Sequence, residues 1–197
     1  MIRLYCATGN AGKLAEFRLA AQSANLEIDP VPGYRDIPPC IEDGATFEEN
    51  ALIKARHYAP YVEGLIFADD SGLVVEALGG APGVYSARYS GPGATDDSNN
   101  RLLLENLRGA SNRAASFVCA IALLRDGEHI GTFTGRVDGV LLKSPRGPGG
   151  FGYDPLFYYP PYGSTFGEAS EESKFDVSHR GKAFRSMLKT LTNPGWS

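Results

Sequence analysis

The sequence predicts an α/β protein, and three features of the chain indicate this. An apolar run over residues 2–7 leads directly into a glycine-containing turn and then into apolar residues at helical spacing, the pattern of strand, turn and helix. Two long apolar segments joined by Asp126-Gly127 are typical of an antiparallel hairpin. The length of 197 residues suits one domain, or one domain with two lobes, with a sizeable core.

The first part of the chain alternates strands and helices around a proline-rich connection. Four prolines between residues 30 and 39 indicate irregular backbone. The capping pattern Thr46-x-x-Glu49 precedes apolar residues in steps of three and four and therefore predicts a helix start. In order, we expect a strand over residues 2–7, a helix with its apolar positions at Leu14, Phe17, Ala21 and Ala24, a loop over residues 30–44 and a helix over residues 47–62.

The remaining elements follow from short apolar runs and their punctuation. Asp69-Asp70-Ser71-Gly72 has the composition of a turn and is expected to separate two short strands. Gly109 and Pro194 mark the ends of two helices. In order, we expect strands over residues 65–68 and 73–75, a helix over 95–107, strands over 115–124, 128–142 and 156–159, and a last helix with Phe184, Met187, Leu188 and Leu191 inward.

The charge balance and the cysteines narrow the partners and the compartment. The chain has 19 Lys and Arg against 23 Asp and Glu, a net charge of −4, so we expect neither nucleic acid nor a membrane as the principal partner. Three widely spaced cysteines favour free thiols in a reducing compartment. No apolar run reaches the roughly 18 residues of a spanning helix, and we expect a cytoplasmic protein.

The turn after the first strand is a candidate phosphate site. Its backbone N–H groups, a hydroxyl, an amide and an ammonium group suit phosphate oxygens. Its two glycines are separated by two residues and its lysine is followed by leucine, so it is not a Walker A motif. A plain strand-to-helix turn with Asn10 as the helix N-cap remains the alternative. The turn consists of Thr8, Gly9, Asn10, Ala11, Gly12 and Lys13.

Two adjacent carboxylates, Asp69 and Asp70, form a candidate metal site. Like charges this close need a cation or hydrogen-bond donors, and Mg²⁺ is commonly held by one or two carboxylates together with substrate phosphates. The alternative is a turn in which aspartate caps the backbone. Glu42 is a candidate second ligand, although a single loop glutamate is more often simply solvated.

A third group of candidates lies in the last quarter of the chain. Residues 147–152 satisfy the G-x-G-x-x-G pattern, but no βαβ unit surrounds them, so a dinucleotide fingerprint is rejected. A glycine loop that places Phe151 and Tyr153 against a flat ligand is favoured, with a core role for Phe151 as the alternative. Lys174, His179 and Arg180 form a basic group, whose alternative role is a solvated face.

Taken together, these segments resemble one family, the inosine/xanthosine triphosphate pyrophosphatases. The resemblance spans nearly the whole chain and rests on several motifs in the same order. The segments are Thr8-Gly9-Asn10-x-x-Lys13, Thr46-Phe47-x-Glu49-Asn50-Ala51, Ala68-Asp69-Asp70-Ser71-Gly72-Leu73, residues 79–89, Gly150-Phe151-Gly152-Tyr153-Asp154-Pro155 and Ser178-His179-Arg180-Gly181.

The resemblance implies a long mixed twisted sheet with flanking helices, whose two lobes surround a central nucleotide cleft, and a homodimer. It also implies Mg²⁺-dependent hydrolysis of ITP, dITP and XTP between the α and β phosphates. The products would be the monophosphate and pyrophosphate, which keeps deaminated purines out of DNA and RNA. The whole chain, residues 1–197, would form this one pyrophosphatase domain.

Matching positions carry the family's roles to this chain. Asp70 would be the proton acceptor and a metal ligand, with Glu42 as the second ligand. The substrate would be bound by Thr8, Gly9, Asn10, Ala11, Gly12 and Lys13 at its triphosphate, by Ser71, and by Phe151, Gly152, Tyr153, Asp154, Lys174, His179 and Arg180 at its base and sugar. Asn50 and Lys54 would support the phosphates.

Two other functions compete with this interpretation. A nucleotide-binding regulatory module would keep the pocket without the chemistry, but a pure binder gains little from paired carboxylates beside an anionic ligand. An RNA-binding domain is disfavoured by the net charge of −4.

Overall fold

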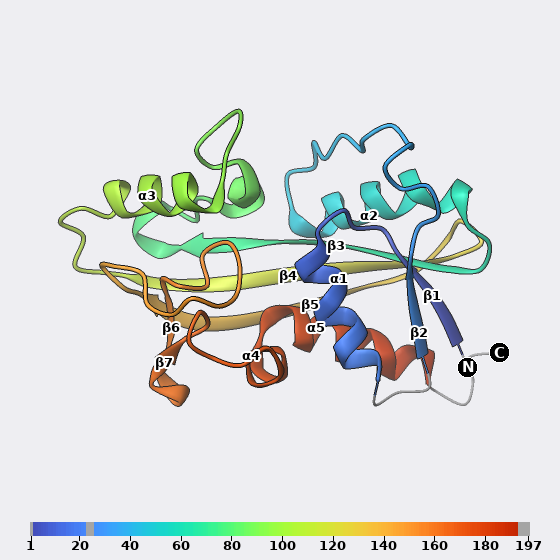
Figure 1. Ribbon diagram of the computed structural model, residues 1–197. Helices are drawn as coiled ribbons and strands as arrows, with labels where there is room; N and C mark the ends of the chain where they lie inside the picture. Colours follow the sequence, from blue (N-terminus) through green and yellow to red (C-terminus); the bar gives the residue numbers. More distant parts are fainter. Residues whose placement is uncertain (1, 23–25, 193–197) are drawn as a thin grey trace. The chain divides into compact units, whose positions relative to one another are not determined.

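The computed structural model describes residues 2–22 and 26–192 of the chain. Within these residues the strands form one seven-stranded sheet in the order β2-β1-β3-β4-β5-β6-β7 (Figure 1). The elements are β1 (Ile2–Cys6), α1 (Ala11–Ala21), β2 (Leu26–Pro30), α2 (Phe47–Tyr58), β3 (Leu65–Val75), α3 (Asp96–Asn106), β4 (Ala114–Arg125), β5 (Glu128–Leu141), β6 (Phe157–Tyr159), β7 (Ser164–Thr165), α4 (Glu171–Val177) and α5 (His179–Leu191).

The sheet is mixed, as expected for an α/β protein with an antiparallel portion. β1 pairs in parallel with β2 and with β3, whereas β6 is antiparallel to both β5 and β7. The β4–β5 hairpin turns at Asp126 and Gly127, which both have positive φ, 49° and 84°. Positive φ at both central positions is the requirement of the two-residue turn that the sequence predicted.

Strand β3 differs from the expectation. The sequence predicted a turn at residues 69–72, but β3 runs without a break from Leu65 to Val75. Asp69 tolerates a place in this buried strand because its carboxylate lies 2.8 Å from the ammonium group of Lys13. The compensating charge comes from a distant part of the chain, so the local composition could not reveal it.

The chain divides into two compact units. The first unit comprises residues 1–70, 119–135 and 179–197, and the second comprises residues 71–118 and 136–178. The first unit is held by an aromatic core in which Phe17 of α1 contacts Phe67 of β3 at 5.0 Å and Phe184 of α5 at 5.3 Å between ring centroids. This core explains why α1 and α5 lie side by side in Figure 1.

The second unit has its own aromatic core. Phe117 of β4 packs on Phe157 of β6 at 4.5 Å between ring centroids, and Phe166 packs on both. Leu103 and Leu107 from the end of α3 bury their side chains in the same cluster, as the predicted helix required. Each fully buried side chain of this kind contributes about 1.5–3 kcal/mol to stability.

The helix starts were predicted more accurately than the ends. Thr46 and Thr95 cap α2 and α3 with their hydroxyls. α2 ends at Tyr58 and continues as a 3-10 turn over Ala59–Tyr61, so the predicted helix to residue 62 was too long.

Sequence analysis did not predict β2, β7 and α4, and the helix end predicted at Pro194 lies outside the described residues. No helix in the described ranges is long and apolar enough to cross a membrane.

Candidate active site

The turn between β1 and α1 is built as a helix cap. The side-chain oxygen of Asn10 accepts a hydrogen bond from the N–H of Lys13 at 3.0 Å, and the hydroxyl of Thr8 accepts one from the N–H of Asn10 at 3.2 Å. The cap therefore exists, as the structural alternative required. A capped N-terminus also directs further N–H groups and a positive dipole end outward, which is what phosphate oxygens need.

This turn faces a cavity of about 550 Å³ within the first unit. Tyr34, from the loop between β2 and α2, stacks on Tyr58 at 4.6 Å between ring centroids. A Cβ added to Gly9 would lie 3.0 Å from the Tyr34 ring, so the close approach of this ring favours glycine in the turn. The cavity is lined by Thr8, Gly9, Asn10, Ala11, Leu14, Pro30, Tyr34, Arg35, Ile37, Pro39, Cys40, Glu42, Lys54 and Tyr58.

Asp69 is a buried carboxylate surrounded by cations. Its Oδ2 lies 2.8 Å from Lys13 Nζ and 3.6 Å from Arg180 Nε. Burial by itself would raise the pKa of Asp69, but the charges of Lys13, Arg180 and Lys54 outweigh burial and hold this pKa well below its ordinary value. Asp69 is therefore ionised and serves as an anchor for the cations.

Behind Asp69 lies an ion pair that sequence reasoning missed. Arg180 Nη1 donates to Glu16 Oε2, and both side chains are buried. Burial disfavours the Arg180 cation, yet Glu16 and Asp69 together raise its pKa above the ordinary value. One available signal was spacing, because Glu16 follows Lys13 by three helical positions and so belongs to the same helix face.

Asp70 has the opposite electrostatic environment. Burial raises the pKa of Asp70, and Lys54, Lys13 and a hydrogen bond with Asn50 only partly offset it, while Glu42 raises it further. Neighbouring carboxylates thus have pKa values displaced in opposite directions. Such a displacement is a common mark of an acid–base pair in which one group anchors and the other handles a proton.

Lys54 connects β3 at Asp69 to Glu42 in the loop before α2. Its ammonium group donates to Asp69 O at 3.0 Å and pairs with Glu42 Oε2 at 2.8 Å. Burial would lower the pKa of Lys54, but Asp69 and Glu42 outweigh burial and raise it. The loop is fixed further by Asn50 Oδ1, which accepts the N–H of Gly44 at 2.8 Å. Lys54 therefore links Glu42 to the strand that carries Asp69, and Asn50 holds the loop that carries Glu42.

The side chains in this part of the first unit carry one more negative than positive charge, which favours a bound cation. Three cations, Lys13, Lys54 and Arg180, face four carboxylates, Glu16, Glu42, Asp69 and Asp70. No group of three or more His, Cys, Asp or Glu side chains in the described ranges forms a metal cluster by itself. The donor set fits a hard cation that takes one or two carboxylates and completes its shell elsewhere.

The second unit contains a separate group of predicted residues in the loop over residues 150–154. Asp154 Oδ2 accepts the N–H of Phe151 at 2.9 Å and pairs with Lys174 Nζ at 2.6 Å. The Lys174 ammonium group also lies 4.6 Å from the centre of the Phe151 ring, a cation–π distance. Phe151 is only half-buried, so a pure core role does not describe it.

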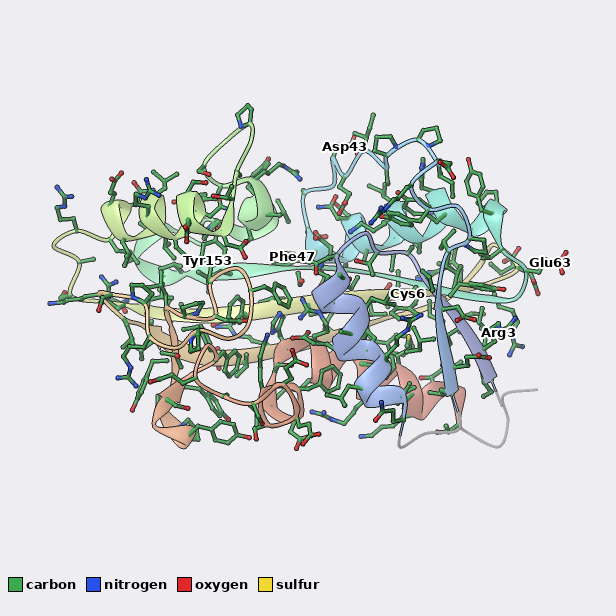
Figure 2. The ribbon with its side chains drawn as sticks, in the orientation of Figure 1. Arg3, Cys6, Asp43, Phe47, Glu63 and Tyr153 are labelled. Carbon is green, nitrogen blue, oxygen red and sulfur yellow. The ribbon has the colours of Figure 1, made fainter. Side chains whose placement is uncertain are left out.

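The other predicted residues differ in exposure. Tyr153 is buried in the core of the second unit, where its hydroxyl donates to Ser86 O at 2.7 Å, so it holds the loop rather than lining an open surface (Figure 2). His179 and Arg180 open α5 in the first unit and are buried, which excludes the solvated face considered for them. Ser71 follows Asp70 in β3 and is half-buried.

Comparison with known proteins supports the same interpretation. The family model described as the Ham1 family matches residues 4–190. A curated dITP/XTP pyrophosphatase of Desulfotalea psychrophila is 51% identical over 181 residues, which cover 92% of this chain and 81% of that protein. One from Geobacter sulfurreducens is 48% identical over 199 residues, covering 100% of this chain and 98% of that protein. The solved structure of a HAM1 protein from Coxiella burnetii superposes with a TM-score of 0.86 at 40% identity and covers 98% of this chain and 99% of its own.

Proposed function

The chain belongs to the Ham1 family, and on that premise we propose that it is a nucleoside triphosphate pyrophosphatase acting on ITP, dITP and XTP. It releases the monophosphate and pyrophosphate and thereby keeps deaminated purines out of DNA and RNA. Relatives 42–51% identical that bear the name dITP/XTP pyrophosphatase support a pyrophosphatase reaction and the substrates dITP and XTP.

The single observation that carries the chemistry is that the pKa of Asp69 is lowered while the pKa of the adjacent Asp70 is raised. Asp69 is ionised and committed to Lys13 and Arg180. Asp70 has a raised pKa and lies in the same strand one position further on. A carboxylate whose proton affinity is increased by burial is suited to take a proton from the attacking water. We therefore assign the proton acceptor to Asp70 and the positioning of cations to Asp69.

The phosphates are bound by the turn that opens α1. N–H groups of this turn and the hydroxyl of Thr8 supply donors, and the cavity they face also contains Arg35 and Lys54. Lys13 approaches from α1 while its ammonium group is held by Asp69 at 2.8 Å. Preorganised donors of this kind stabilise the charge that develops on phosphate oxygens during hydrolysis.

Mg²⁺ is the proposed cofactor, with Asp70 and Glu42 as the residues that would hold it. When bound, it would neutralise phosphate charge and lower the pKa of a coordinated water. Glu42 already pairs with Lys54, so Lys54 keeps this carboxylate oriented for the role. The phosphates would supply the remaining ligands, as is usual for this ion.

The base and sugar are assigned to Phe151 and Gly152 of the glycine loop and to Lys174, whose ammonium group lies 4.6 Å from the centre of the Phe151 ring. A ring at the tip of a glycine loop stacks on purines. A 6-keto oxygen accepts hydrogen bonds, whereas the 6-amino group of adenine leaves the same donors unpaired, and this difference can discriminate by several orders of magnitude. Selectivity for ITP over ATP is the expected result.

The assembly and location are part of the same proposal. We expect a homodimer, a cytoplasmic location and one catalytic domain over residues 1–197. The family match over residues 4–190 supports the single domain. All three cysteines are free thiols, which fits a reducing compartment.

Product analysis tests the function. Purified protein with Mg²⁺ is given ITP, XTP, ATP or GTP, and the products are resolved as monophosphate plus pyrophosphate or diphosphate plus phosphate. The expected result is IMP and pyrophosphate from ITP, with ATP nearly untouched. Release of diphosphate and phosphate would refute the reaction, and tight ITP binding without turnover would identify a binding module instead.

Two matched variants localise the chemistry. Asp70→Asn should lower kcat by about 10²–10⁴-fold, the usual contribution of a general base. Asp43→Asn is the control, because Asp43 is an exposed carboxylate in the same loop as Glu42 (Figure 2). Equal losses in the two variants would show that the effect is one of surface charge.

A further inference from the structure

Helix α3 begins beside the loop that carries Phe151, and two of its side chains hydrogen-bond to the backbone of Gly152 in that loop. Asp96, the first residue of α3, accepts the N–H of Gly152 at 2.7 Å through Oδ2. Asn100, one helical turn further on, donates from Nδ2 to the carbonyl oxygen of Gly152 at 2.9 Å. Both polar groups of Gly152 are thus hydrogen-bonded to one face of one helix.

Hydrogen bonds to Asp154 and to Asp96 fix the backbone on either side of Phe151. The peptide that precedes Phe151 is held by its own N–H, which donates to Asp154 at 2.9 Å. The peptide that follows Phe151 is held by the N–H of Gly152, which donates to Asp96 at 2.7 Å. Because φ and ψ of a residue are the rotations of its two flanking peptides, these two bonds together set both torsions of Phe151.

The glycines of the loop make this arrangement possible. Gly152 has φ of +61°, in the left-handed region that disfavours other residues. Gly150 has φ of +75°, and a Cβ there would lie 2.4 Å from Asp154 Oδ2. Because glycine loses more conformational freedom than other residues when it is ordered, the hydrogen bonds from α3 to Gly152 help to hold this loop in one conformation.

We propose that Asp96 and Asn100 are positioning residues that hold Phe151 in the orientation that receives the purine base. This inference rests on the proposed function, because it takes Phe151 as a residue that contacts the base. Asp96 and Asn100 do not touch the reacting phosphates; they act through Gly152. Their contribution belongs to substrate binding and base selectivity, and only weakly to the chemical step.

The kinetic test compares three substitutions with wild-type protein. Asp96→Ala removes the acceptor, Asp96→Asn retains an acceptor oxygen, and Asp97→Ala removes the neighbouring exposed carboxylate of the same helical turn. The expected result for Asp96→Ala is a KM for ITP raised about tenfold, which corresponds to roughly 1.4 kcal/mol, with kcat changed less than threefold and the preference for ITP over ATP reduced. Asp96→Asn and Asp97→Ala should stay close to wild type.

A second measurement does not depend on turnover. The exchange rate of the Gly152 amide hydrogen reports directly whether its bond to Asp96 is made. Exchange should be about tenfold faster in Asp96→Ala than in wild type or Asp97→Ala, while amides of the β4–β5 hairpin at residues 119–135 keep their rates. Asn100→Ala, which removes the hydrogen bond to the carbonyl oxygen of Gly152, should also raise the KM for ITP.

The outcomes separate the two proposals. If wild-type protein does not hydrolyse ITP, the proposed function has failed. If wild type hydrolyses ITP and Gly152 exchanges faster in Asp96→Ala while KM and selectivity stay unchanged, the positioning role alone is overturned. Equal effects of Asp96→Ala and Asp97→Ala would also overturn it, because they would trace the effect to charge at the helix N-terminus.

Discussion

Replacing Asp69 and Asp70 one at a time by asparagine should move the stability of the protein in opposite directions. Asp69→Asn removes the carboxylate that lies 2.8 Å from Lys13 and 3.6 Å from Arg180, leaving two cations with less compensation. Asp70→Asn removes a carboxylate whose raised pKa means that the folded protein disfavours its ionised form. The first change should destabilise the protein, and the second should leave it as stable or more stable.

The magnitude for Asp69→Asn follows from burial. Breaking a buried ion pair by removal of one partner costs about 3–5 kcal/mol. The Lys13 side chain is 16% exposed, so water can partly solvate its charge, and Arg180 is still paired with Glu16 in the variant. The low end of the range, about 3 kcal/mol, therefore applies. For a chain of this size each kcal/mol shifts Tm by about 2–4 °C, so Tm should fall by about 6–12 °C.

The pH dependence has a definite sign for each residue. The pKa of Asp69 is lowered on folding, so its stabilisation is fully present above the ordinary carboxyl value, about 4, and is lost as pH falls through the lower folded value. The Tm gap between wild type and Asp69→Asn should therefore close in acid. The pKa of Asp70 is raised, so its cost is absent below about pH 4 and develops as pH rises through the folded value.

The assay is thermal unfolding from pH 3 to 8 in the presence of a chelator, together with turnover of ITP with Mg²⁺ at neutral pH. Asp70→Asn should lose more turnover than Asp69→Asn, although it is the more stable variant. A lower Tm for Asp70→Asn than for Asp69→Asn at pH 7, or equal losses of turnover, would refute the assignment of separate roles.

Three further predictions concern the first unit. Glu16→Gln should lower the free energy of unfolding by about 3 kcal/mol in denaturant titrations, because it removes the carboxylate that pairs with the buried guanidinium of Arg180. Gly9→Ala should cost about 1–3 kcal/mol, because the new methyl group would meet the ring of Tyr34, and a second change, Tyr34→Leu, should restore part of the loss in the same titrations. Arg35→Gln should weaken inhibition by inorganic pyrophosphate several-fold, since it removes one of the cations lining the cavity that the phosphate turn faces.

Matched controls exist for two of these variants. Glu48→Gln changes an exposed glutamate of α2 and should leave stability within about 0.5 kcal/mol of wild type. Arg56→Gln changes an arginine that lines a different cavity of the first unit and should leave pyrophosphate inhibition unchanged. A stability loss for Glu16→Gln no greater than that for Glu48→Gln would contradict a stabilising role for the buried Glu16–Arg180 pair. Unchanged pyrophosphate inhibition in Arg35→Gln would contradict phosphate binding in the cavity that Arg35 lines.

Local sequence signals predicted the parts of the fold that depend on local chemistry. The caps at Asn10 and Thr46 and the hairpin turn at Asp126 each satisfy their own backbone within a few residues. The continuous strand through Asp69 could not be predicted in this way. Its stability depends on Lys13, which is 56 positions earlier in the chain, and composition alone favours a turn there.

The candidate site shows the same division between local and distant information. Motifs singled out Asp70 and the turn of residues 8–13 because their residue types suit the proposed chemistry. They did not identify Glu16, whose role exists only through Arg180 at the other end of the chain. Nor did they identify Asp96, whose partner is a backbone group, because a backbone N–H leaves no trace in the sequence.

The continuous course of β3 has a consequence for redesign. Asp69 and Asp70 are mounted on a strand that is buried along nearly its whole length, so they have little freedom to adapt to a new ligand. The residues assigned to the base lie instead on the glycine loop at residues 150–154 and on α4. Laboratory evolution toward a different nucleobase should therefore succeed through loop substitutions, with the strand that carries Asp69 and Asp70 left as it is.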